Sequence, residues 1–174
     1  MIEIRLANSN DYINVRNFYY SLIAAMASAE YKPGWKKDIY PTKDFLVKSI
    51  KSKELFVGLI DGCIVSCMVL NHEYNESYKN VQWSVETKDS ELFVIHALGV
   101  HPAFSGKGIA KQMVQKAIET AQKNDAKTIR LDVLLGNFPA VKTYKKMGFN
   151  YIDTIQMFYE DTGWTQYELF EYMI

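Results

Sequence analysis

The stretch HPAFSGKGIAKQMV, residues 101–114, places two glycines around a lysine at the junction of two regular segments. An apolar run over residues 92–100 precedes it and predicts a strand. After it, apolar residues recur at helical spacing and predict a helix over residues 106–124. The first turn of such a helix leaves backbone N–H groups without partners, and with the helix dipole they form an anion site. The stretch predicts either a phosphate-binding turn or an ordinary tight turn between strand and helix.

The spacing of apolar residues divides the rest of the chain into further strands and helices. Alternation and β-rich composition predict strands over residues 2–6, 55–60, 63–70, 81–85, 128–133, 151–158 and 166–173. Helical spacing predicts helices over residues 10–26, 42–52 and 138–147. The pair Asp61-Gly62 predicts a two-residue hairpin, and Asp161-Thr162-Gly163 predicts a final hairpin.

The order of these elements predicts where a ligand binds. A strand, a helix and a second strand joined by a long crossover imply that strands 92–100 and 128–133 are parallel, with the helix on one face. Their carboxyl ends therefore share one edge of the sheet. Ligands of open α/β sheets bind just beyond such an edge, where segments 101–110 and 134–137 both emerge.

The composition indicates one α/β domain over residues 1–174 whose charges produce no strong overall electrostatic field. The chain has 174 residues, 48% of them hydrophobic, which is enough for one core. Lysine plus arginine equals aspartate plus glutamate, so nothing directs it to nucleic acid or a membrane surface. The start lacks the features of a signal peptide and no segment is long enough to span a bilayer, so we expect a cytoplasmic protein.

Neither the cysteines nor the histidines indicate a special site. Cys63 and Cys67 lie four residues apart on one predicted strand. That separation is about 13 Å, beyond the reach of a disulfide, so we expect buried free thiols. The three histidines are too few and too poorly spaced around the cysteines for a zinc site, so no metal is expected.

Two well-known phosphate motifs do not fit the glycine turn. A P-loop would need a glycine at His101 and a serine or threonine after Lys107. A dinucleotide-binding fingerprint would need a third glycine where Lys111 stands. Asp132, at the end of the next strand, keeps a nicotinamide-binding module open as an alternative.

A different pattern matches both loops at the shared edge. It consists of His101-Pro102-x-x-Ser105-Gly106-Lys107-Gly108-Ile109-Ala110 and Leu131-x-Val133-x-x-x-Asn137-x-x-Ala140-x-x-x-Tyr144-x-x-x-Gly148-Phe149. Together these closely resemble the GNAT family of acetyl-coenzyme A-dependent N-acetyltransferases. The resemblance implies the GNAT fold: a mixed, mostly antiparallel sheet whose central parallel strands splay apart, flanked by about four helices.

The resemblance also implies which residues bind acetyl-coenzyme A. By analogy, the turn holds the diphosphate, the preceding strand pairs with the pantetheine arm, and the following helix lies beside that arm. The corresponding positions here are Leu98, Gly99, Val100, Ser105, Gly106, Lys107, Gly108, Ile109, Ala110, Lys111, Asn137, Ala140 and Tyr144. The family usually has arginine or glutamine where this chain has Ser105, so Lys107 or Lys111 is expected to supply part of the missing phosphate contact.

Two residues are candidates for proton transfer. Tyr144 corresponds to the tyrosine often assigned as the general acid; the alternative is a core tyrosine at helical spacing. The strand over residues 92–100 lacks the glutamate base of many family members, and its interior offers only His96. Strand alternation places His96 on the face of Leu98 and Val100, and an ordinary pKa of about 6.5 suits a base. A hydrogen-bonded interior histidine is the alternative, and Glu91 is a weaker candidate.

Aromatic side chains in two loops are candidates for the acceptor pocket. Trp35 and Tyr40 lie in a loop stiffened by prolines, while Tyr74, Tyr78 and Trp83 lie in an irregular segment. Such rings can form an apolar or cation-binding pocket, although each taken singly could be a half-buried loop anchor.

These observations together predict direct transfer of an acetyl group from acetyl-coenzyme A to a primary amine. We expect a small-molecule acceptor in a ternary complex, because the aromatic loops suggest a closed pocket. The alternatives are a protein or peptide N-acetyltransferase and a non-catalytic acyl-coenzyme A-binding module. The last hairpin could support a homodimer.

Overall fold

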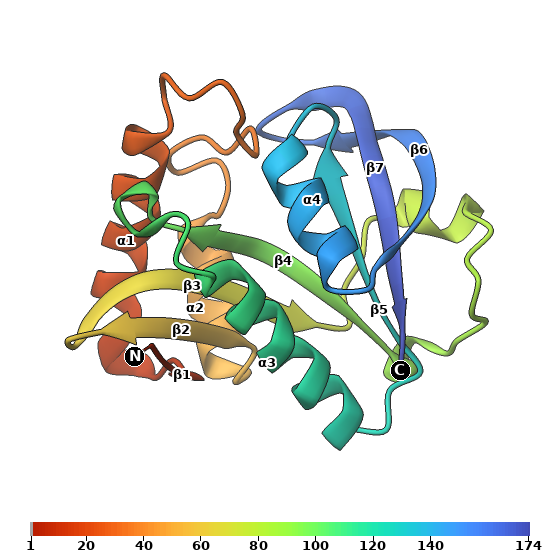
Figure 1. Cartoon of the computed structure of the whole chain (residues 1–174), viewed down its shortest axis with the longest axis horizontal. Helices are drawn as coiled ribbons and strands as arrows, with labels where there is room; N and C mark the ends of the chain where they lie inside the picture. The colour runs from red at the N-terminus through yellow and green to blue at the C-terminus, as the bar shows by residue number, and fades with distance from the viewer. Residues whose placement is uncertain (1) are drawn as a thin grey trace.

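The computed structural model describes residues 2–174 and places a seven-stranded sheet within them (Figure 1). The strands lie in the order β1-β2-β3-β4-β5-β7-β6 and are antiparallel except for the β4–β5 pair. Their bounds are β1 (Glu3–Leu6), β2 (Leu55–Ile60), β3 (Cys63–Asn71), β4 (Leu92–Val100), β5 (Thr128–Leu134), β6 (Asn150–Tyr159) and β7 (Gly163–Met173). The mixed α/β fold predicted from the sequence is confirmed.

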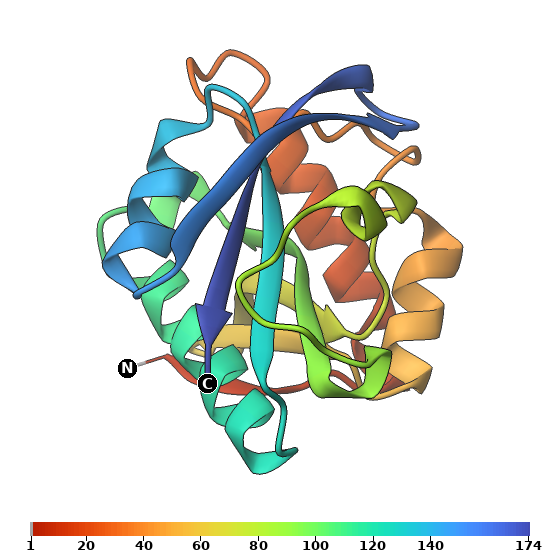
Figure 2. The ribbon, with the colours of Figure 1, turned by 90° about the vertical axis from the view of Figure 1, so that its right-hand side faces the viewer.

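Four α-helices of this part of the chain cover the two faces of the sheet (Figures 1 and 2). They are α1 (Tyr12–Ala25), α2 (Lys43–Lys51), α3 (Ile109–Lys123) and α4 (Phe138–Lys146). Buried apolar residues of α1 and α2 form one core with β2 and β3. Those of α3 and α4 form a second core on the opposite face. No helix within residues 2–174 is both long enough and apolar enough to cross a bilayer.

The parallel strands β4 and β5 separate after their first three residues. They pair only at Leu92–Thr128, Phe93–Ile129 and Val94–Arg130. Beyond Val94, β4 keeps its ladder with β3, and β5 keeps its ladder with β7. The predicted splay is therefore present, and it leaves one edge of β4 without a neighbouring strand.

A β-bulge in β4 alters the predicted direction of His96. Between the pairs Cys67–Gly99 and Val69–His96, two residues of β4 oppose one residue of β3, and Ala97 has a φ of +50°. The buried Tyr19 hydroxyl fixes this bulge by donating to the Ala97 carbonyl at 2.8 Å. Strict alternation fails here, so the expectation that His96 shares the face of Leu98 and Val100 is wrong. Its ring packs toward α2, with its centre 6.4 Å from that of Phe45.

The predicted strand over residues 81–85 does not form. The segment runs as an irregular loop that joins β3 to β4 through the 3-10 helices η2 (Glu76–Asn80) and η3 (Asp89–Glu91). Contacts with side chains, rather than the hydrogen bonds of a strand ladder, hold this loop in position. The Ser84 N–H donates to Glu171, Arg130 donates to the Val85 carbonyl, and the Trp83 ring covers the Arg130 guanidinium at 4.4 Å. Arg130 and Glu171 form a buried ion pair beneath it.

Two smaller differences have local causes. Helix α3 begins at Ile109 rather than at Gly106, because Gly106 and Gly108 adopt left-handed φ values of +77° and +73°. A short 3-10 helix, η4 (Pro102–Phe104), fills part of the turn before them. Cys67 is a buried free thiol as expected, but Cys63 is exposed because it starts β3 at the hairpin turn.

Candidate active site

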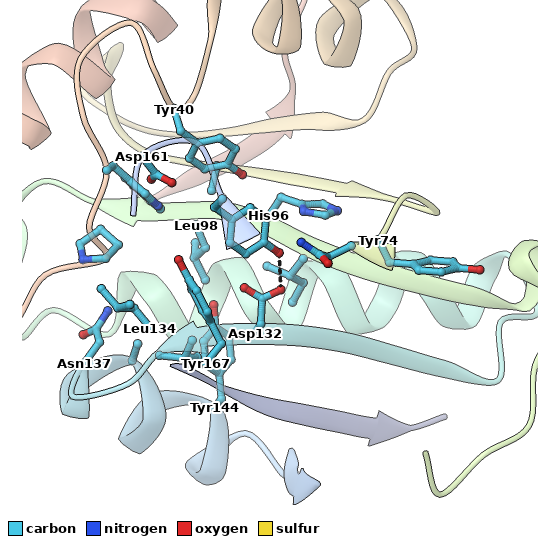
Figure 3. Close-up of a pocket in the computed structure, with 18 of the residues that line it drawn as sticks. Tyr40, Tyr74, His96, Leu98, Asp132, Leu134, Asn137, Tyr144, Asp161 and Tyr167 are labelled. Carbon is cyan, nitrogen blue, oxygen red and sulfur yellow. Dashed lines mark hydrogen bonds between the residues drawn. The ribbon is translucent and has the colours of Figure 1, made fainter. Parts of the chain in front are cut away.

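A cavity of about 320 Å³ occupies the gap between the splayed strands (Figure 3). Residues of β4 and β5 form its two sides, and α4, the loop after α1, the loop after β3 and the β6–β7 turn complete it. The lining residues from the predicted site are Trp35, Tyr40, Tyr74, His96, Leu98, Asn137, Ala140 and Tyr144. The topology thus collects most of the predicted catalytic and acceptor residues around one space.

Tyr144 reaches the cavity from α4. The side chain is only 8% exposed, and its ring packs edge-on against Phe149. No group within residues 2–174 forms a hydrogen bond with its hydroxyl. Burial raises the pKa of this phenol above its ordinary value, and the Asp132 carboxylate adds to the increase. Tyr144 therefore remains protonated at neutral pH and presents an uncommitted O–H to the cavity.

His96 is held in one tautomer. Its Nε2 lies 3.0 Å from the Asn71 side-chain oxygen and 2.9 Å from the Glu73 carbonyl oxygen. Both partners accept hydrogen bonds, so Nε2 carries the proton and Nδ1 keeps a lone pair. Burial lowers the pKa of His96 to about 4, which replaces the ordinary value assumed from the sequence. The imidazole is neutral throughout the physiological range.

Asp132 is a cavity residue that the sequence did not assign to the site. It extends from β5 and accepts hydrogen bonds from the hydroxyls of Tyr78, at 2.7 Å, and Tyr159, at 2.9 Å. Both bonds end on Oδ2, which leaves Oδ1 without a partner within residues 2–174. Burial raises the pKa of this carboxyl, while the two phenol donors favour its charged form.

A second carboxyl, Asp161, lies at the β6–β7 turn and closes the other end of the cavity (Figure 3). It is 5% exposed, and no side chain within residues 2–174 pairs with it. Burial raises its pKa, while its own backbone N–H, that of Thr162 and the charge of Lys36 oppose this increase. From the sequence, Asp161 was visible only as a turn residue, because nothing local indicates which wall the turn completes.

The predicted acceptor residues separate into two groups. Trp35, Tyr40 and Tyr74 line the cavity. Tyr78 stands behind it as the donor to Asp132. Trp83 lies apart, with its indole N–H donated to the Tyr78 carbonyl and its ring over Arg130. The structure therefore does not bring Trp83 to the cavity.

The glycine turn is exposed and open. A Cβ added at Gly106 or Gly108 would meet no atom within 4 Å. The first hydrogen bond of α3 runs from the Gln112 N–H to the Gly108 carbonyl. The N–H groups of residues 106–111 consequently have no acceptor within residues 2–174. Ser105 and Lys107 are exposed beside them, and the Lys107 ammonium lies 5.0 Å from the centre of the Phe104 ring.

The remaining predicted positions divide between the cavity and its surroundings. Leu98 lines the cavity on the unpaired edge of β4. Gly99 faces α1, where an added Cβ would lie 2.5 Å from Leu22, and its carbonyl accepts from the buried Ser66 hydroxyl. Glu91 lies at the opposite end of β4 in an ion pair with Lys127, away from the cavity.

Comparison with known proteins identifies the family. The sequence profile of the acetyltransferase (GNAT) family matches residues 19–149. The chain therefore belongs to this family. An uncharacterized N-acetyltransferase of Methanocaldococcus jannaschii is 36% identical over 67 residues, which are 38% of this chain and 30% of that protein. An N-alpha-acetyltransferase of Saccharolobus solfataricus is 26% identical over 67% of this chain and 70% of its own.

Solved structures agree with this assignment. A GNAT-family acetyltransferase from Streptococcus agalactiae superposes with a TM-score of 0.81 at 19% identity, covering 99% of this chain and 95% of its own. An acetyltransferase from Salmonella typhimurium, solved with its cofactor acetyl-CoA, has a TM-score of 0.71 at 14% identity and covers 99% of this chain and 94% of its own. The predicted family, fold and enzyme class are confirmed.

Proposed function

We propose that this protein transfers an acetyl group from acetyl-coenzyme A directly to the primary amine of a small molecule. One observation carries the proposal: an open row of unpaired backbone N–H groups at the start of α3 stands beside a cavity containing Tyr144 and His96. The gap between the separated strands β4 and β5 connects this row of N–H groups with the cavity.

The residues of the turn and the strand edge fit the coenzyme. Six unpaired N–H groups and the positive end of the α3 dipole are suited to binding a diphosphate. Because Gly106 and Gly108 have no side chain, a diphosphate can approach these N–H groups closely. Lys107 and Lys111 add positive charge beside the turn. The edge of β4 at Leu98 and Val100 offers backbone groups to an amide-bearing arm, as a sheet edge does to an added peptide. Asn137, which directly precedes α4, and Ala140 of α4 line the same cavity and are proposed to contact that arm.

The bound coenzyme would supply an activated thioester, and the side chains of the cavity handle the protons. The amine nitrogen forms a bond to the acetyl carbon, and the bond from that carbon to sulfur breaks. His96, through its free Nδ1, accepts a proton from the attacking nitrogen and releases it to solvent. Tyr144 gives its proton to the departing sulfur and regains one from solvent. The products are an acetylated amine and a free thiol.

The shape of the entrance favours a small acceptor. A Cβ on Gly34 would lie 2.7 Å from Thr162 and 3.0 Å from Leu134, so the loop after α1 touches the β6–β7 turn above the cavity. Figure 2 shows this orange loop beside the tip of the blue hairpin. This contact leaves less room above the cavity for an extended peptide than for a small amine. A protein N-terminus is the second candidate, supported by the N-alpha-acetyltransferase among the relatives.

A panel of acceptors tests this proposal. We expect thiol release from acetyl-coenzyme A with at least one small primary amine among polyamines, amino acids and aminoglycosides. Peptides with free amino termini should react at least tenfold more slowly. Faster reaction with a peptide than with every small amine would show that the acceptor is a protein N-terminus, the second candidate. Coenzyme binding without thiol release from any acceptor would indicate a non-catalytic binding module, and stabilisation by NAD instead would indicate a nicotinamide site.

The pH dependence tests the role of His96. Because the pKa of His96 is about 4, we expect no inflection of kcat/KM near pH 6.5. The rate should rise with pH up to the pKa of the acceptor, about 10 for an alkyl amine, because only the uncharged amine attacks. His96→Ala should lower kcat by about tenfold or more across this range, as expected for loss of a general base. A wild-type inflection near 6.5 that is absent in the variant would contradict the structure, and unchanged kcat would remove His96 from the mechanism.

A further inference from the structure

The cavity has an unusual balance of charge for an enzyme whose reacting group is an amine. Its described lining includes the carboxyls of Glu73, Asp132 and Asp161 but no lysine or arginine. His96 cannot offset them, because its imidazole is neutral. Glu73 stands at the rim, paired with Lys48 on the surface. Two carboxyls therefore remain inside without a cationic partner.

These two carboxyls lie at different ends of the cavity. Figure 3 places Asp132 beside Tyr144 and His96, and Asp161 beside Tyr40 at the other end. Asp132 is therefore next to the reacting groups. Asp161 is too deeply buried, at 5% exposure, for water alone to compensate a charge cheaply. The three carboxyls are not arranged as a metal site, since residues 2–174 contain no group of three or more potential ligands suited to one.

The surroundings of Asp161 suit an organic cation. Tyr40 and Trp35 line the same end of the cavity, with ring centres 6.2 Å apart. Aromatic faces attract alkylammonium groups, most strongly where water is excluded. Asp161 and Trp35 also line a second cavity, together with Lys32, Lys36 and Lys37. None of these lysines lines the first cavity or forms an ion pair with Asp161 within residues 2–174, although the charge of Lys36 acts on its carboxyl.

We propose that the acceptor is an aliphatic dication, a diamine or polyamine, whose second ammonium binds Asp161 beside the rings of Tyr40 and Trp35 while its reacting nitrogen lies near Asp132 and His96. This rests on the proposed acetyl transfer and specifies its substrate class. The distal ammonium remains charged throughout the reaction, so its contact with Asp161 contributes to binding and does not oppose deprotonation of the nitrogen that attacks.

Three acceptors of equal length test the idea on the wild-type protein. We expect 1,4-diaminobutane to exceed n-butylamine in kcat/KM by at least tenfold, which is about 1.4 kcal/mol. The anion 4-aminobutyrate should be the poorest of the three. Equal rates for the diamine and the monoamine, or a preference for the anion, would overturn the dication while leaving acetyl transfer intact. No thiol release with any of the three or with the wider panel would instead refute the proposed function.

A pair of neighbouring variants assigns the distal contact. Asp161→Asn should raise the KM for 1,4-diaminobutane by about tenfold and lower the preference for this diamine over n-butylamine, the ratio of their kcat/KM values, by a similar factor. Glu160→Gln removes the same charge one residue away at an exposed position and should change neither value. Calorimetry of the diamine with each protein, without coenzyme, gives a readout independent of catalysis. Equal effects of the two variants, or equal losses for both amines, would contradict the assignment of Asp161.

Discussion

Replacing Tyr144 by phenylalanine is expected to lower kcat by about 100-fold, the usual range for removal of a general acid. The effect should fall on kcat and kcat/KM together, because the hydroxyl acts on the departing sulfur rather than on either bound substrate. Steady-state thiol release with a saturating amine measures it. The dissociation constant of acetyl-coenzyme A, from calorimetry, should change by less than threefold.

The surroundings of Tyr144 make this substitution a clean one. Its hydroxyl forms no hydrogen bond within residues 2–174, so the phenylalanine leaves no buried partner unsatisfied and keeps the ring contact with Phe149. Tyr151→Phe is the matched control, since it removes a hydroxyl that meets only Thr154 on the exposed side of β6. Full activity in Tyr144→Phe would leave Tyr144 as a core residue that also lines the cavity.

The burial of Tyr144 has a consequence for the chemistry. A phenol with a raised pKa stays protonated, but it is also a weaker acid in water. The same exclusion of water disfavours a free thiolate, so proton transfer to sulfur remains favourable inside the cavity. Activity should therefore show no loss attributable to Tyr144 ionisation up to pH 10.

Features that depend on neighbouring residues or on element order could be predicted from the sequence. Gly106 and Gly108 mark a turn because their left-handed φ values require no side chain. Crossover handedness brings that turn beside Asn137 at one sheet edge. The separation of β4 from β5 followed from the family resemblance, and the ladder confirms it.

Features that depend on distant contacts could not be predicted. The bulge at Ala97 depends on Tyr19, which lies 78 residues earlier in the chain, and it reverses the face predicted for His96. Asp132 lines the cavity and accepts hydrogen bonds from Tyr78 and Tyr159, which come from two other segments of the chain. Trp83 resembled a pocket residue by composition, yet it covers the ion pair of Arg130 and Glu171. No local pattern indicates which partner such a side chain meets.

The second large effect is expected from a substitution in the glycine turn before α3, where the coenzyme is proposed to bind. Gly108→Ala should raise the dissociation constant and the KM of acetyl-coenzyme A by about 30-fold, or ~2 kcal/mol. The new methyl group would occupy the open space beside the unpaired N–H groups, where the diphosphate is proposed to bind. Calorimetry with coenzyme A and kinetics at saturating amine measure the two constants, and kcat at saturating coenzyme should change by less than threefold.

The effect of backbone strain in Gly108→Ala must be distinguished from a direct loss of coenzyme binding. An alanine at positive φ costs roughly 1–2 kcal/mol of folding stability wherever it occurs. Gly62→Ala is the matched control, because Gly62 has a φ of +75°, close to the +73° of Gly108, and also has open space around it. It lies in the β2–β3 turn, so it should lose similar stability in urea unfolding and bind the coenzyme normally. If both variants weaken binding equally, or neither does, the N–H groups at the start of α3 do not hold the diphosphate.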